Sequence, residues 1–166
     1  MPFRLIQCMT LVAVFASPAC SLGDARRESS EASAIASLRT IVSAELTYAV
    51  ACANNGFAPA LEDLTRPAPG SPAGFIGSDL GTSGVVKNGY IITLRAGDGA
   101  TVQTPASGTC NGASHDAMTA FFAEAHPAPD SSTGGRSFAT DQRGDIYVRS
   151  DGQIIGPDMS GTTKLE

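Results

Sequence analysis

Apolar positions recur every three to four residues through one long segment of the first half of the chain. They are Ile35, Leu38, Ile41 or Val42, Leu46 and Ala49. This spacing puts them on one side of an α-helix, so it predicts an amphipathic helix of about six turns over residues 30–52. A serine at position 29 or 30 can cap its start, and Asn54-Asn55-Gly56 can end it. The apolar side must be buried, and we expect it to lie on a β-sheet.

The second half of the chain carries strand patterns separated by turn signals. Residues 89–95 are rich in β-branched side chains, and Gly97-Asp98-Gly99 leads into residues 100–104, which predicts a hairpin. Residues 136–141 and 145–149 alternate around a glycine-containing turn and predict a second hairpin. Residues 57–64 indicate a short turn of helix. Residues 116–125 contain helix formers, but their length and their place between two hairpins also permit a strand.

A short apolar leader precedes the predicted helix. Arg4 is followed by an apolar run of about eleven residues, Leu5 to Phe15, whereas a bilayer span needs about twenty. Small residues at Ser17 and Ala19 then suit cleavage after residue 19, as in a signal peptide. We therefore predict a signal peptide over 1–19, a tether over 20–29, a globular domain over 30–155 and a disordered tail over 156–166.

Removal of the leader would leave three cysteines, Cys20, Cys52 and Cys110. Cys20 directly follows the predicted cleavage point, and a lipid on it would account for the odd thiol in an oxidising compartment. The usual lipobox has Leu where this chain has Ser17, so ordinary secretion remains open. A bond between Cys52 and Cys110 would close a loop of about 59 residues, which the chain-entropy model values at about 4 kcal/mol. We predict a structural disulfide, because the pair lacks the Cys-x-x-Cys spacing of redox and metal sites.

Charge and motif content narrow the possible functions. With 11 basic and 16 acidic residues, the chain has a net charge of −5, which disfavours nucleic acid as a partner. His115 and His126 lie near Asp116 and Glu124 without the spacing of a zinc motif, and we expect His126 to be exposed in a loop. The sequence has no Gly-x-Ser-x-Gly motif and no phosphate loop with its lysine. We therefore predict no catalytic residue, no metal and no cofactor.

Several blocks follow one another in order between residue 26 and about residue 148. They are 31–41 (EASAIASLRTI) with 45–48 (ELTY), Gly56-Phe57 with Leu61 and Leu64, 76–80 (IGSDL), 87–93 (KNGYIIT) and 136–146 (RSFATDQRGDI). Their order and spacing resemble the globular part of type IV pilin-like proteins, especially small type II secretion pseudopilins of Gram-negative bacteria. The resemblance implies an α+β fold, in which one long N-terminal helix packs on a small antiparallel sheet of three to four strands. It also implies a strand near residues 118–126, which decides the ambiguous segment in favour of a strand.

The resemblance ends at the N-terminus. Pilin-like proteins carry a Phe-Thr-Leu-Ile-Glu-like processing site and a long apolar anchor helix, and the expected leader here has neither. We therefore expect an exported, non-catalytic binding or accessory protein in the periplasm or at the outer membrane, held by a lipid on Cys20. One alternative is a minor subunit that docks on a type IV pilus or a type II secretion pseudopilus through the long helix. Another is a small periplasmic enzyme using acidic and histidine side chains of residues 115–130.

Overall fold

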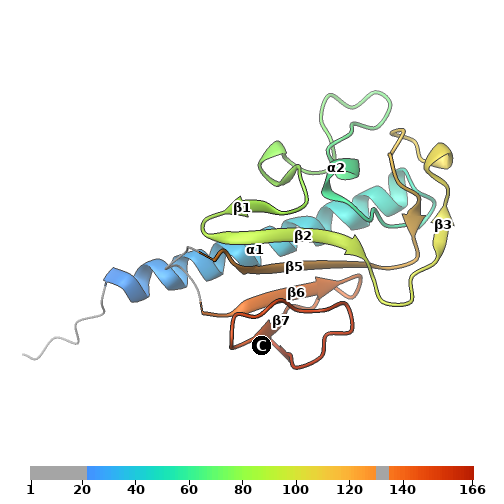
Figure 1. Cartoon of the computed structure of the whole chain (residues 1–166). Coiled ribbons are helices and arrows are strands. Elements are labelled where there is room, and N and C mark those ends of the chain that lie inside the picture. Colours follow the sequence, from blue (N-terminus) through green and yellow to red (C-terminus); the bar gives the residue numbers. More distant parts are fainter. Residues whose placement is uncertain (1–21, 130–134) are drawn as a thin grey trace, which may run out of the picture.

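One long helix lies across a face of an antiparallel sheet (Figure 1). The computed structural model describes residues 22–129 and 135–166. Helix α1 spans Leu22–Ala51, α2 spans Leu61–Leu64, and single 3₁₀ turns occupy Ser78–Leu80 and Ala106–Gly108. The strands are β1 (Val85–Lys87), β2 (Tyr90–Ala96), β3 (Val102–Thr104), β4 (Ala117–Met118), β5 (Phe121–Pro127), β6 (Ser137–Asp141), β7 (Tyr147–Arg149) and β8 (Thr163–Lys164). The predicted α+β class is confirmed.

The main sheet has six strands in the order β1-β2-β5-β6-β7-β8, and every neighbouring pair is antiparallel. The expectation of three to four strands was therefore too low. The extra strands lie at the two edges. Asn88 and Gly89 have positive φ angles of 49° and 80°, which suits the tight turn that adds β1 to β2. At the other edge, the end of the chain returns as β8 beside β7.

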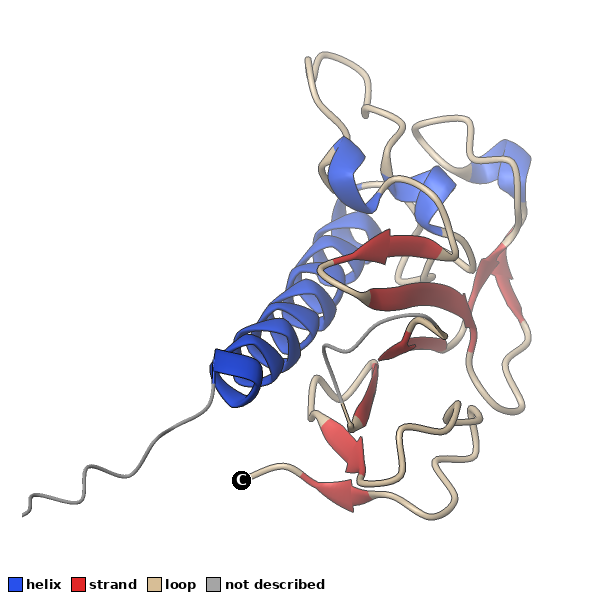
Figure 2. Cartoon of the chain, turned by 60° about the vertical axis from the view of Figure 1, so that its left-hand side comes forward, coloured by secondary structure: helices blue, strands red, loops and turns tan. Residues whose placement is uncertain are grey.

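Helix α1 lies along one side of the sheet (Figure 2). It buries an apolar stripe there, with Leu38, Ile41 and Tyr48 fully buried. Its end at Ala51, followed by Asn54 and Asn55 with positive φ, agrees with the prediction. Its start does not, because the segment expected to be a tether is helical from Leu22 onward. The predicted stripe also contained one wrong member: Leu46 is 48% exposed, and the buried position next to it is Glu45.

The hairpin expected around residues 97–99 does not form. Strand β2 pairs with β5 along seven residues, so its second edge is already occupied. The turn instead directs β3 out of the main sheet to pair with β4. The predicted strand over the ambiguous segment is confirmed by β4 and β5, and the predicted β6–β7 hairpin is confirmed as well.

The face of the sheet opposite α1 is covered by the C-terminal segment. Ile155 is fully buried against Phe122 and Ala139, and Met159 packs beside them. The chain then forms β8, and Leu165 packs on the main core. The tail predicted to be disordered is thus part of the fold, because Met159 packs on the face opposite α1 and Leu165 packs on the main core.

Candidate functional site

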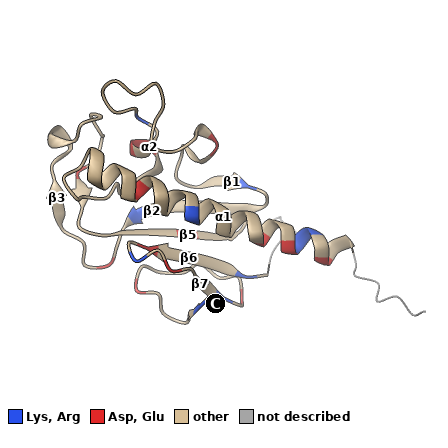
Figure 3. Ribbon diagram, turned by 180° about the vertical axis from the view of Figure 1, so that it is seen from behind, with Lys and Arg blue, Asp and Glu red and all other residues tan. Residues whose placement is uncertain are grey.

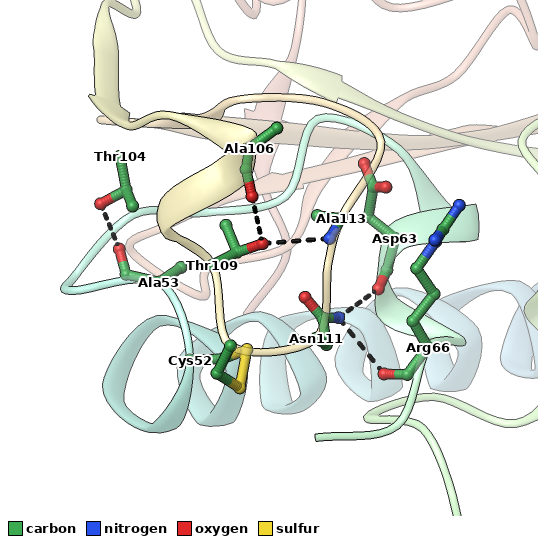
Figure 4. Close-up of a disulfide and its surroundings, with 10 residues drawn as sticks. Cys52, Ala53, Asp63, Arg66, Thr104, Ala106, Thr109, Asn111 and Ala113 are labelled. Atoms are coloured by element: carbon green, nitrogen blue, oxygen red, sulfur yellow. Dashed lines mark hydrogen bonds between the residues drawn. A yellow bond between two sulfur atoms is a disulfide. The ribbon is translucent and has the colours of Figure 1, made fainter. Parts of the chain in front are cut away.

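A loop after β3 is fixed to the C-terminal end of α1 (Figure 4). The sulfur atoms of Cys52 and Cys110 lie at bonding distance, 2.11 Å, as the sequence predicted. Backbone hydrogen bonding supports the same contact, because the Cys110 amide donates to the Cys52 carbonyl at 3.0 Å. The Thr104 hydroxyl donates to the Ala53 carbonyl at 2.7 Å. The helix end and the loop therefore form one rigid unit.

Asp63, in α2, organises the far side of this loop. Its side chain is fully buried, and one oxygen accepts a hydrogen bond from the Ser114 amide at 2.7 Å. The other oxygen lies 2.8 Å from Nδ1 of His115, whose side chain is 56% exposed. The Asn111 side chain donates to the Asp63 carbonyl at 2.9 Å. Asp63 thus compensates its burial with fixed donors from a loop about fifty residues further along the chain.

Glu45 is a second buried carboxyl in the same region. Its Oε2 accepts a hydrogen bond from the Ala58 amide at 2.9 Å, while Oε1 has no partner among the described residues. Burial raises the pKa of Glu45 well above its ordinary value, and the negative charge of Asp63 adds to the rise. Burial also raises the pKa of Tyr48 to about 12. Glu45 is fully buried, so its side chain has no access to a substrate in solution.

Another carboxyl–histidine pair lies on the other face of the sheet. Glu124 is buried, and one of its oxygens lies 2.8 Å from Nδ1 of His126, whose side chain is only 15% exposed. The expectation that His126 is an exposed loop residue was therefore wrong, because β5 continues through it. The other oxygen accepts from the Ile155 amide at 3.4 Å, and Arg95 donates to the Ile155 carbonyl at 3.2 Å. Burial raises the pKa of Glu124, and the hydrogen bond from His126 opposes that rise.

Between residues 115 and 126, the side chains that an enzyme would use have structural partners, whereas Asp130 lies outside the described residues. His115 contacts Asp63, Asp116 accepts from the Ala106 amide at 2.8 Å, and His126 contacts Glu124. In residues 22–129 and 135–166, no three His, Cys, Asp or Glu side chains are grouped as metal ligands. The His115–Asp63 and Asp116–Ala106 contacts each join two segments, whereas His126 and Glu124 lie in the same strand and Glu124 joins the C-terminal segment through the Ile155 amide.

Open cavities lie on the surface away from these pairs. One, of about 360 Å³, runs beside α1 and is lined by Arg39, Thr40, Ser43, Ala44, Thr47 and Phe75. Another, of about 340 Å³, lies nearer the start of α1 and is lined by Arg26, Ser29, Ser30 and Asn88. A third, of about 320 Å³, lies at the sheet end, where Asp98, Arg143 and Asp158 are among its walls. Sequence reasoning missed all three, because each combines segments that are distant along the chain.

The candidate lipid-attachment residue Cys20 and the predicted leader 1–19 lie outside the described residues. The first described residue, Leu22, is already helical. By length and composition alone, α1 is long and apolar enough to cross a bilayer. However, 44% of the 18-residue stretch that meets this criterion is buried inside the protein. Buried core helices pass the same test.

No family model, curated protein or solved structure matches this chain. Function therefore has to be inferred from the chain's own residues.

Proposed function

We propose that this protein is an exported, non-catalytic binding or accessory module of the bacterial cell envelope, with a pilin-like head and a lipid on Cys20. The observation that carries the proposal is the long helix lying on an antiparallel sheet, with its end joined to a loop through Cys52 and Cys110. A disulfide of this kind persists in oxidising compartments and is rare in the cytosol, which supports export. The helix-on-sheet arrangement is also the one that the resemblance to pilin-like proteins implies.

The buried carboxyl pairs support a non-catalytic role. Asp63 and Glu124 each hold a loop or segment in place through several hydrogen bonds. A substrate would have to displace those contacts, and the fold would lose them. Binding is therefore more consistent with the surface cavities and the exposed side of α1 than with the acidic and histidine residues.

Intact-mass spectrometry of protein from the membrane fraction tests export and anchoring together. We expect a chain that starts at Cys20, carries a diacyl or triacyl adduct, and is two hydrogens lighter than the dithiol form because Cys52 and Cys110 are joined. A Cys20→Ser chain serves as the control and should lose the adduct and the membrane association. An uncut chain with free thiols would contradict both parts of the proposal.

A second candidate is a minor subunit that docks on a type IV pilus or a type II secretion pseudopilus. It is favoured by two apolar side chains on the outer side of α1, Leu46 at 48% and Val50 at 82% exposure. Binding to purified pilus or pseudopilus subunits should then be lost in a Leu46→Glu, Val50→Glu chain. It should persist in a Val86→Glu chain, because Val86 is 60% exposed but lies on β1. If the two chains bind alike, this candidate is wrong.

A further inference from the structure

We propose that the N-terminal part of α1 and the β1–β2 turn form a binding site for a phosphate-type oxyanion. The site is the cavity of about 340 Å³ between the helix and the turn. Its walls are the side chains of Arg26, Ser29 and Ser30 on the helix and Asn88 on the turn. None of these residues belongs to the carboxyl–histidine pairs or to the disulfide.

The walls offer hydrogen-bond donors without partners. Within the described chain, no hydrogen bond or ion pair occupies the side chains of Arg26, Ser29 or Ser30. Ser30 is the informative residue, because it is only 8% exposed and yet its hydroxyl has no partner. Because Ser30 lines the cavity, its hydroxyl can donate to a ligand there.

The turn that closes the cavity is held in a fixed position. The Asn88 side-chain amide donates to the Ser33 hydroxyl at 2.6 Å, which ties the turn to the next turn of the helix. Positive φ angles at Asn88 and Gly89 fit the tight turn between β1 and β2. The second hydrogen of the Asn88 amide remains available, so the turn also faces the cavity with a donor.

Charge is distributed unevenly around this part of the helix, although charges of both signs occur on it (Figure 3). Successive residues of a helix are rotated by about 100° around its axis. Arg26, Ser29 and Ser30 therefore fall within an arc of about 100° on one side of the helix, whereas Asp24 and Glu28 lie on nearly the opposite side from Arg26. The third nearby acid, Glu31, accepts a hydrogen bond from Arg136 at 3.0 Å. No carboxylate of residues 22–129 or 135–166 lines the cavity, so its described walls favour an anion.

The donor set identifies the class of anion. An arginine guanidinium presents parallel N–H groups that match two oxygens of one phosphate, and hydroxyls and an amide can satisfy the remaining oxygens. Free phosphate and the phosphate of a lipid headgroup share this chemistry. The headgroup becomes the natural source if the proposed function holds, because Cys20 would place a lipid six residues before Arg26.

Nuclear magnetic resonance on the full-length Cys20→Ser chain tests the site independently of the lipid anchor. Titration with inorganic phosphate should shift the amide signals of Ser29, Ser30 and Asn88, and acetate should shift them less. Flotation of the same chain with phosphatidylglycerol vesicles, compared with phosphatidylcholine vesicles, separates the two sources. Binding to the anionic vesicles without a response to free phosphate assigns the headgroup, and a response to free phosphate alone assigns the soluble ion.

Matched variants decide whether the cavity is responsible. Arg26→Gln should weaken binding about tenfold, because hydrogen bonds to a charged group are lost. Ser30→Ala should weaken it less. Arg27→Gln removes the same charge one residue away, outside the cavity wall, and should leave the affinity nearly unchanged. Equal losses in Arg26→Gln and Arg27→Gln, an equal response to acetate, or no binding to either phosphate source would overturn the proposal.

Discussion

Glu45 occupies a position on α1 where an apolar side chain would be expected. It lies four residues after Ile41 and three before Tyr48, and all three are fully buried. Its burial favours the protonated, neutral carboxyl, which explains how an acidic residue fits into the core. The same spacing was visible in the sequence. The neighbouring Leu46 was more apolar, however, and was assigned to the buried side in its place.

The raised pKa of Glu45 predicts a specific dependence of stability on pH. Above about pH 4.3 the unfolded chain releases this proton while the folded chain keeps it. The free energy of unfolding should therefore fall as pH rises, by up to about 1.4 kcal/mol per pH unit, until the folded group also ionises. Glu45→Gln cannot ionise at this position. Its free energy of unfolding, relative to that of the wild-type chain, should therefore rise over the same pH range. Urea unfolding at a series of pH values measures this difference.

Glu28 provides the control for that experiment, since it is an exposed glutamate on the same helix. Glu28→Gln should unfold with the same pH dependence as the wild-type chain. If Glu45→Gln and the wild-type chain keep a constant difference from pH 4 to pH 8, Glu45 does not hold a proton in the fold.

At the scale of elements, the link between α1 and the loop after β3 should carry a large part of the stability. Cys52 and Cys110 are 58 positions apart, and in the chain-entropy model a closed loop of this size stabilises by about 4 kcal/mol. Replacing both cysteines by serine should lower the free energy of unfolding by about that amount in urea titrations. Cys20→Ser should leave it unchanged, and an equal loss in that chain would show that Cys20 takes part in the bonding.

The C-terminal segment gives a second test at this scale. Ile155 is fully buried on the sheet face opposite α1, whereas Ile154 beside it is 61% exposed. Ile155→Ala should cost about 3 kcal/mol, as large-to-small changes in a core do. Ile154→Ala should cost less than about 0.5 kcal/mol. Similar small costs for both, measured by thermal or urea unfolding, would mean that this segment does not cover the sheet in solution.

Local patterns predicted some elements well and others poorly. The α1 core, β2 and the β6–β7 hairpin carry periodic apolar or β-branched residues, and their assignment followed from that. The strand at β5 was assigned from the resemblance to pilin-like proteins, because its own residues also permitted a helix. Strand β1 was missed, although Asn88-Gly89 is a strong hairpin signal, because only three residues precede the turn. The pairing of β3 was wrong because a turn signal does not say which strand already occupies the neighbouring edge.

At the scale of the whole molecule, the cysteine pair was predictable and the polar contacts were not. The disulfide was predicted because an oxidising compartment favours a bond and Cys52 and Cys110 lack the Cys-x-x-Cys spacing of redox and metal sites. The contacts of Asp63 with His115, and of Glu31 with Arg136, join residues 52 and 105 positions apart. Acidic and basic residues are frequent along the chain, and nothing local distinguishes the correct partners.

One shared core should make the chain unfold as a single cooperative unit. Leu38, Ile41 and Tyr48 of α1 belong to the same buried cluster as Ile92 of β2 and Phe138 of β6. We therefore expect two urea transitions to have the same midpoint when the disulfide is intact. One is the loss of the helix signal in far-ultraviolet circular dichroism, and the other is the loss of the tyrosine signal in near-ultraviolet circular dichroism. The exposed residues 22–29 have few contacts and should exchange their amide hydrogens faster than the rest of α1. A helix signal that survives beyond the tyrosine transition would contradict the shared core, because it would require α1 to persist without the sheet.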